Sequence, residues 1–173
     1  MSKIKQHSNL IWQPLLAIIY VGVVLWVLSF VDSSQLIWAV GAGALSSSSC
    51  IVFSTPKNCS GNSKHLIGGY VLGALVGVCV HFVMSNLMPL LSADAVMVNS
   101  KVFWALASIS VGITIILMAK LDMFHPPAVG LSLVLVLDIH HYEIIAVIVM
   151  AVIVLALLRH FLNPHLKNLV VVD

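Results

Sequence analysis

Charge is what this sequence has least of. Asp, Glu, Lys and Arg make up 8% of its 173 residues, whereas soluble domains usually carry about 25% charged residues. Hydrophobic residues reach 61%, above the roughly 45–50% of soluble domains. This balance excludes an ordinary soluble domain and gives no sign of a nucleic-acid partner, and the length allows one compact unit. We therefore expect residues 1–173 to form a single integral membrane domain in contact with the lipid bilayer.

The residues of several common functional sites are also missing. The cysteines are odd in number and lack metal-ligand spacing, so we interpret them as small apolar side chains: Cys50, Cys59 and Cys79. No nucleophile stands with a base and an orienting acid, and no glycine-rich phosphate loop occurs. Histidines and acids do share residues 138–143, but adjacent histidines point in different directions, which favours a solvated loop over a metal site. The sequence thus predicts no enzyme, no metal site and no cofactor.

The apolar residues fall into six runs separated by polar breaks. A helix needs roughly 20 apolar residues to cross a bilayer. The runs are Ile11 to Val31, Leu36 to Phe53, Leu66 to Met88, Val102 to Ala119, Phe124 to Leu137 and Ile144 to Leu162. The first is too long for a signal-peptide core, so we keep it as a span. The predicted fold is an all-α, polytopic membrane helix bundle with about six transmembrane segments.

Basic residues predict the orientation of the bundle, because cytoplasmic loops carry the excess of Lys and Arg. With the N-terminus inside, only Lys101 falls outside. The others fall inside: Lys3, Lys5, Lys57, Lys64, Lys120, Arg159 and Lys167. We expect both termini to be cytoplasmic. The lack of an Arg- and Ser-rich transit extension favours a bacterial plasma (inner) membrane over an organelle membrane.

The two halves of this topology have opposite orientations, as in transporters built from 3+3 inverted repeats. The second and fifth spans then correspond, and both are short or interrupted. Glycines and four consecutive serines interrupt the second, and Pro126 and Pro127 open the fifth. Such pairs point to a substrate site near the membrane midplane. The halves share little residue identity, so the repeat stands as a hypothesis.

The start of the fifth span holds the first candidate site. Proline is favoured at the first helical positions, so Pro126 and Pro127 predict a new helix with His125 at or beside its N-cap. Helix N-termini commonly hold anions. A neutral imidazole donates one hydrogen bond and accepts another, which offers a polar, titratable contact near the membrane. Ala128 completes this first turn.

Residues 46–49 place serine hydroxyls around the whole circumference of the second span. They can bond back to backbone carbonyls one turn earlier, which is common in membrane helices, or contact a substrate. We name Ser47, Ser48 and Ser49 for the second role.

Glycines recur every four residues in the third span, at Gly69, Gly73 and Gly77, and His81 extends the same face. Such a stripe lets another helix backbone approach closely, within one subunit or between two. We take it as a candidate homo-oligomer interface. An ionisable residue at this depth is also a functional candidate, so His81 joins the candidates for lining a path.

The segment Phe124-His125-Pro126-Pro127-Ala128-Val129-Gly130-Leu131-Ser132-Leu133 resembles the signature of the HPP family of small integral membrane proteins. The resemblance extends over roughly Leu36 to Leu137. It includes the serine run, the apolar tract from Cys50 to Phe53, Pro56, Lys64 and Ile67-Gly68-Gly69. The family usually has Gly-Ala-Thr/Ser-Ala where this chain has the serines.

The resemblance implies a transporter, since related plant and cyanobacterial members are associated with nitrite movement. The leading hypothesis is a transporter or channel for a small anion, nitrite first, bound by backbone N–H groups at the start of the fifth span. The candidate substrate-binding residues are His125, Pro126, Pro127, Ala128, Ser47, Ser48, Ser49 and His81. The alternatives are a structural or regulatory membrane subunit, whose His-Pro-Pro turn only packs a helix break, and a transporter of another small solute.

Overall fold

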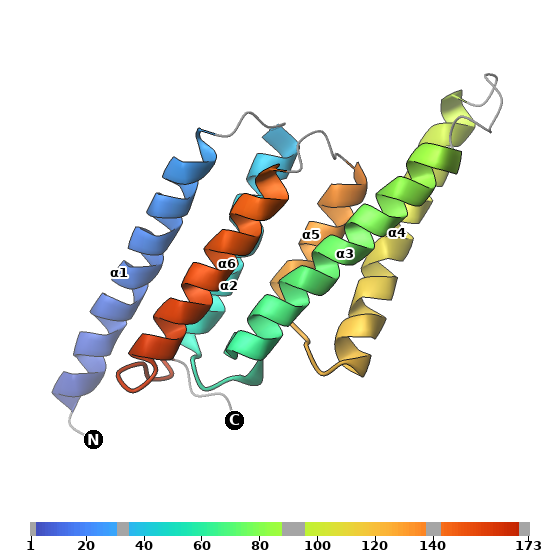
Figure 1. Ribbon diagram of the computed structural model, residues 1–173. Coiled ribbons are helices and arrows are strands. Elements are labelled where there is room, and N and C mark those ends of the chain that lie inside the picture. Colours follow the sequence, from blue (N-terminus) through green and yellow to red (C-terminus); the bar gives the residue numbers. More distant parts are fainter. Residues whose placement is uncertain (1–2, 31–34, 88–95, 138–142, 170–173) are drawn as a thin grey trace.

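The computed structural model describes residues 3–30, 35–87, 96–137 and 143–169 (Figure 1). These ranges form helices and no strand. The helices are α1 (Lys3–Leu28), α2 (Gln35–Ser54), α3 (Ser63–Leu87), α4 (Val96–Lys120), α5 (Pro126–Leu137) and α6 (Glu143–Leu162), with a short 3-10 turn, η1 (Cys59–Gly61). The fold is therefore the all-α polytopic bundle that the apolar runs predict. Predicted and observed bounds agree closely for the second span, Leu36 to Phe53 against Gln35–Ser54. Helices α1 and α4 begin several residues before the predicted Ile11 and Val102, at Lys3 and Val96.

Four helices are long and apolar enough to cross a membrane, namely α1, α3, α4 and α6. The apolar stretches described in α2 and α5, Trp38–Ser54 and Pro126–Leu137, are shorter. Helix α5 has 12 residues, which gives a length of about 18 Å at 1.5 Å per residue. A bilayer core is about 30 Å thick, so α5 crosses only part of it. The predicted shortness of the fifth span is confirmed, and the inverted repeat stays a hypothesis.

Helix α5 is the inner helix of the bundle. It packs against α2, α3 and α4, and half of its residues are buried: Ala128, Leu131, Ser132, Val134, Leu135 and Val136. A helix that is apolar all round is typical of such a buried position. From Ala128 onward, α5 therefore runs through the interior of the protein.

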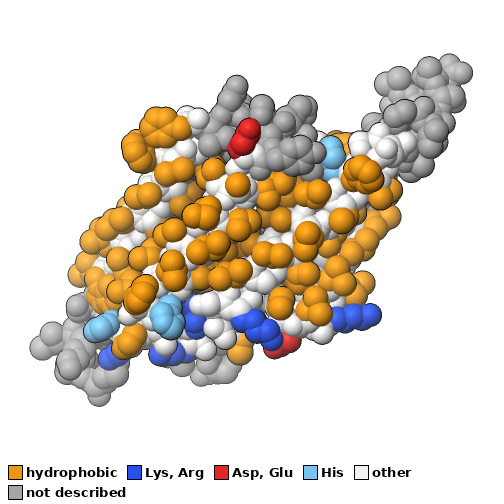
Figure 2. Space-filling model, in the orientation of Figure 1, with side chains coloured by type: hydrophobic (Ala, Val, Ile, Leu, Met, Phe, Trp, Pro, Cys, Tyr) orange, Lys and Arg blue, Asp and Glu red, His pale blue; other side chains and the backbone are white. Residues whose placement is uncertain are grey.

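The outer surface of the bundle is apolar. Large side chains such as Ile11, Phe82 and Phe161 are about 70% exposed, and Figure 2 shows hydrophobic atoms covering the middle of the molecule. An apolar surface this wide is unfavourable in water and favourable against lipid tails. These side chains form the contact with the bilayer.

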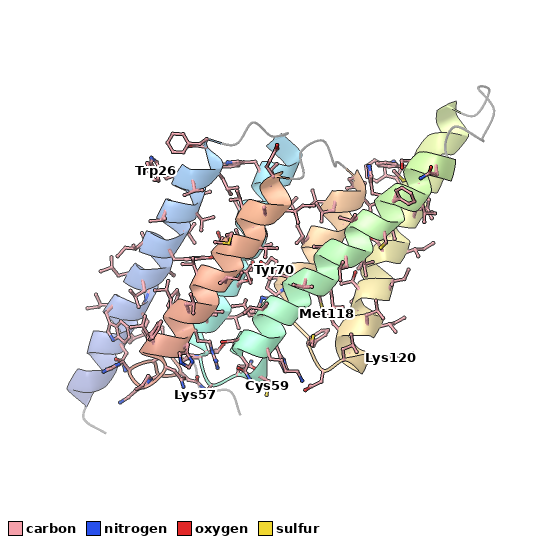
Figure 3. All side chains as sticks on the ribbon, in the orientation of Figure 1. Trp26, Lys57, Cys59, Tyr70, Met118 and Lys120 are labelled. Atoms are coloured by element: carbon pink, nitrogen blue, oxygen red, sulfur yellow. The ribbon has the colours of Figure 1, made fainter. Side chains whose placement is uncertain are left out.

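The charged residues lie at the two ends of the bundle. Figure 2 shows Lys and Arg side chains gathered along its lower edge, where α1 begins and α6 ends in Figure 1. Figure 3 labels Lys57 and Lys120 there, and Glu143 starts α6 at the opposite end. This separation agrees with the predicted topology. The side chains of Lys3, Lys5 and Lys101 lie outside the described ones, and the assignment of the Lys-rich end to the cytoplasm stays a prediction.

The glycine face of α3 packs against α5 of the same chain. A Cβ added to Gly69 would lie 2.7 Å from His125 Cβ, and one added to Gly77 would lie 2.9 Å from the Ser132 carbonyl oxygen. At Gly73 the added atom would collide with the Ala128 carbonyl oxygen. The homo-oligomer interface predicted at Gly69, Gly73 and Gly77 is therefore wrong, because α5 already fills this face. Packing within the subunit explains the stripe.

The loop at residues 55–62, which joins α2 to α3, is tied down at the Lys-rich end. Arg159 of α6 donates through Nη2 to the Pro56 carbonyl at 3.0 Å and through Nη1 to Asn62 Oδ1 at 3.3 Å. The Lys57 N–H donates to Asn168 Oδ1 at 3.1 Å. We call this segment the 55–62 loop. It covers His125, since its Ser60 carbonyl oxygen lies 2.8 Å from His125 Nδ1.

The segment after α6 is held by a buried glutamine of α1. Gln13 donates through Nε2 to the Lys167 carbonyl at 2.9 Å and also to the Phe53 carbonyl, and its Oε1 accepts from the Lys167 N–H at 3.2 Å. The Leu169 N–H adds a bond to the Ser54 carbonyl at 2.8 Å. The first and last helices are thus joined through the end of α2.

Helices α1 and α6 leave an apolar groove between them, nearer the Glu143 end. Its volume is about 300 Å³, and its lining includes Val24, Val27, Val147 and Met150. Tyr20 and Ala151 also line the groove, and the Tyr20 hydroxyl donates to the Ala151 carbonyl at 3.0 Å. Contact between these two helices is therefore looser here than between α3 and α5.

Candidate functional site

The break between α4 and α5 places His125 in the bundle interior. After Lys120 the chain turns through Asp122, whose φ of 51° is left-handed, a conformation that Asp tolerates better than most residues. The Met123 N–H then donates to the Met118 carbonyl at 2.9 Å. Helix α5 begins at Pro126, as the two prolines predict. His125 therefore immediately precedes the helix.

The imidazole of His125 is fully buried and bonded through both nitrogens. His125 is 0% exposed. Its Nδ1 lies 2.8 Å from the Ser60 carbonyl oxygen of η1, and its Nε2 lies 2.8 Å from Ser48 Oγ of α2. The ring is also tilted at 41° to that of Tyr70 in α3, with 5.6 Å between the ring centres. Three separate elements therefore meet at this side chain.

Ser48 connects His125 to Tyr70. Its Oγ lies 2.9 Å from the Tyr70 hydroxyl and 2.9 Å from the Ala44 carbonyl oxygen one turn earlier, besides its contact with His125. Ser48 is 0% exposed and Tyr70 is 1% exposed. We call His125, Ser48, Tyr70 and the Ser60 carbonyl the His125 cluster. Figure 3 labels Tyr70, which lies within the bundle rather than at either end.

The other predicted serines do not join the cluster. Ser49 is buried, but its hydroxyl donates to the Ser46 carbonyl at 2.8 Å, and Ser46 donates to the Ala42 carbonyl at 2.8 Å. Ser47 is exposed on the outside of α2. Bonding back to the backbone, the alternative considered from the sequence, accounts for Ser46 and Ser49. Only Ser48 also reaches His125.

The first three residues of α5 offer no free backbone donor for an anion. Proline has no N–H, so Pro126 and Pro127 offer no backbone donor. Pro126 is exposed and Pro127 is half-buried. The N–H of buried Ala128 already donates to the His125 carbonyl at 3.1 Å. Anion binding through these backbone N–H groups stays a prediction, and the side chains of the cluster are the better donors.

His81 lies far from the cluster. Its Nδ1 is 3.3 Å from the carbonyl oxygen of Val136, near the last turn of α5, whereas His125 precedes the first turn. Eleven residues of α3 separate His81 from Tyr70, or about 16 Å along the axis. The structure does not bring His81 and His125 into one site.

Two members of the cluster were not predicted from the sequence. Tyr70 follows Gly69 within an apolar span, and a buried tyrosine usually needs a partner for its hydroxyl, which is a signal that could have been used. Ser60 takes part through its backbone carbonyl, so its side chain gives no signal. Its position depends on the 55–62 loop folding over His125.

Only one acid is described near the start of α5, and it lies outside the cluster. Asp122 accepts a hydrogen bond from Lys64 Nζ at 2.8 Å, and His65 Nε2 lies 3.9 Å from its other oxygen. The bond from the Lys64 ammonium holds the pKa of the Asp122 carboxyl below its usual value. This ion pair fixes the loop before His125 to the first turn of α3.

The described residues contain no group of three His, Cys, Asp or Glu side chains placed to hold a metal ion. Residues 138–142, which include most of the acid and histidine group noted in the sequence, lie outside the described part of the chain. The His125 cluster itself offers hydroxyl groups and one imidazole. Its chemistry is therefore hydrogen bonding and proton exchange.

Comparison with known families gives one match. The family model described as "HPP, transmembrane region" matches residues 2–168. No curated protein and no solved structure matches the chain.

Proposed function

The chain belongs to the HPP transmembrane family, and on that premise we propose that it moves a small anion across the membrane, with nitrite as the first candidate. The observation that carries the proposal is the buried imidazole of His125, bonded to Ser48 inside a membrane bundle. Ionisable residues within membrane segments are rare, and they commonly mark solute or proton pathways.

The charge near the cluster favours an anion. The end of the bundle closest to His125 carries Lys57, Lys64, Lys120 and Arg159, whereas the acid described there, Asp122, is paired with Lys64. A protein surface of one charge raises the local concentration of ions of the opposite charge. The same lysines also satisfy the orientation rule, so they support the proposal without carrying it.

The donors for such an anion are the hydroxyls of Ser48 and Tyr70 and the imidazole of His125. An arriving anion takes the place of one of the hydrogen bonds within the cluster, and a protonated imidazole then pairs with its charge. Opening of the 55–62 loop, which supplies the Ser60 carbonyl, gives access from the Lys-rich end.

A second candidate is a structural or regulatory membrane subunit. The observation that favours it is the packing of His125 against Gly69, together with partners for both ring nitrogens. In that case the cluster only stabilises the break between α4 and α5, and the protein requires a partner protein for its function.

Flux into liposomes that contain only the purified protein separates the two. Nitrite, nitrate, formate and chloride are compared at two pH values, with His125→Gln as the test variant, because Gln keeps one donor and one acceptor. Ser110→Ala is the control, since Ser110 is a buried membrane serine that bonds only locally, to the Ala107 carbonyl at 2.7 Å. The proposed anion transport predicts saturable flux of one anion that is lost in His125→Gln and kept in Ser110→Ala. Absence of flux from folded wild-type protein contradicts it.

A further inference from the structure

The hydrogen atoms of the His125 cluster can be assigned from its acceptors. The Ser60 carbonyl oxygen can only accept, so the His125 Nδ1, 2.8 Å away, carries a hydrogen. In the neutral ring Nε2 then has a lone pair and must accept. Its partner is Ser48 Oγ at 2.8 Å, so Ser48 donates to it.

Ser48 has one hydrogen but two acceptors within reach. Besides Nε2, the Ala44 carbonyl oxygen lies 2.9 Å from its Oγ. The Tyr70 hydroxyl, also at 2.9 Å, donates to Ser48 in either case. When Nε2 gains a proton it becomes a donor to Ser48 Oγ, and the Ser48 hydrogen turns to Ala44. Both protonation states are therefore fully bonded without movement of any heavy atom.

The charge of the protonated state has no counter-ion in the cluster. The titratable groups facing it from α3 are Tyr70, which is neutral, and His65, which faces Asp122. Asp122 is itself paired with Lys64. The other neighbouring elements each have one described titratable side chain, and each of these is exposed. They are Cys50 of α2, Lys120 of α4 and Cys59 of η1. A positive imidazolium buried without a partner is costly, and a bound anion removes that cost.

We propose that His125 binds one proton together with each transported anion, so that the cycle is electroneutral proton–anion symport. The proposal rests on the proposed function and names its coupling ion. On loading, a proton from water adds to the Nε2 lone pair and forms an N–H bond, while the anion binds to the hydroxyls and the new imidazolium. On release, the same proton and the anion leave together, and Ser48 turns its hydrogen back to Nε2. No electrons are transferred.

The test uses nitrite and liposomes in which the pH gradient and the membrane potential are set separately, with protein-free liposomes as background. Electroneutral symport predicts that an alkaline interior drives protein-dependent nitrite uptake. At equilibrium the accumulation is about tenfold per pH unit, since one pH unit corresponds to 1.36 kcal/mol. A membrane potential at equal pH leaves the rate unchanged. His125→Gln loses the response to pH, and Ser110→Ala keeps it.

A second measurement avoids dependence on flux. Nitrite added to the purified protein in weakly buffered detergent solution should cause uptake of up to one proton per chain, seen with a soluble pH dye, and none in folded His125→Gln. Nitrite flux that follows the membrane potential and ignores the pH gradient overturns the symport and leaves the proposed function standing. Absence of protein-dependent flux and of proton uptake overturns both.

Discussion

Gly69 of α3 and His125 stand in direct contact: a methyl group on Gly69 would lie 2.7 Å from the Cβ of His125. The position of the imidazole therefore depends on a residue with no side chain. Contacts this close force a shift of backbone, since neither Cβ can rotate away.

Gly69→Ala should destabilise the protein by about 1–3 kcal/mol, the usual cost of overpacking a filled interior. Thermal unfolding in detergent measures it. The matched control is Gly112→Ala in α4, where an added Cβ meets nothing within 4 Å. Because Ala favours a helix over Gly by up to about 1 kcal/mol, this control should be neutral or more stable. Equal effects at the two positions would contradict the packing described for α3 and α5.

Ser48→Ala should lower stability by about 1–3 kcal/mol, the cost of leaving a buried polar group without a partner. It removes the partner of His125 Nε2 and of the Tyr70 hydroxyl together. Ser110→Ala removes only a local bond to the backbone and should have a smaller effect. Chemical unfolding of both variants, followed by tryptophan fluorescence, makes the comparison. A double variant Ser48→Ala/Tyr70→Phe should lose less than the sum of the single changes, because the two residues share one interaction.

Asp122→Asn should lower the thermal transition slightly near neutral pH. The pKa of Asp122 is lower in the folded protein, because Lys64 donates to its carboxylate. The stabilisation is therefore present above the ordinary carboxyl pKa of about 3.9 and is lost as the pH falls through the lower folded value. Transition temperatures of wild type and variant, measured from pH 7 down to pH 3, should converge at the acid end. High salt should also reduce the difference, since the pair is exposed to solvent.

Gln13→Leu should release the segment after α6. The change leaves the Phe53 carbonyl and the main-chain groups of Lys167 without their side-chain partner. Hydrogen exchange followed by mass spectrometry should show faster exchange at residues 165–169, while α3 exchanges as in the wild type. Unchanged exchange there would mean that Leu166, which is 1% exposed, holds the segment by packing alone.

The helices could be predicted because lipid imposes a simple rule on composition. Runs long enough to cross the bilayer had to be apolar, so the predicted Ile144 to Leu162 lies within a residue of the observed Glu143–Leu162. The starts of α1 and α4 were missed because their first turns extend beyond the apolar runs. The start of α5 was visible, since Pro126 and Pro127 fit only the first turn of a helix. Local chemistry was sufficient for α5 and α6.

The site was only partly predictable because its partners come from distant segments. His125 and Ser48 were named, but 77 residues separate them and nothing in the sequence selects Ser48 from its neighbours Ser47 and Ser49. The choice depends on the rotation of α2 about its axis. The glycine stripe likewise predicted a close helix contact without saying that α5 of the same chain would make it. The prediction of backbone anion binding overlooked the missing N–H groups of the prolines.

The glycine face of α3 also restricts how this protein can change shape. Helices in backbone contact resist sliding at the ends of the glycine stripe. A slide of one turn in one direction would bring the Ser132 carbonyl, now against Gly77, to His81, and a slide in the other direction would bring His125 Cβ, now against Gly69, to His65. Helices α3 and α5 should therefore move as one rigid body that carries Tyr70 and His125 with it. The apolar groove between α1 and α6 has no such restriction. Movement in a transport cycle is therefore expected at that groove and at the 55–62 loop, while His125 and Tyr70 keep their positions relative to each other.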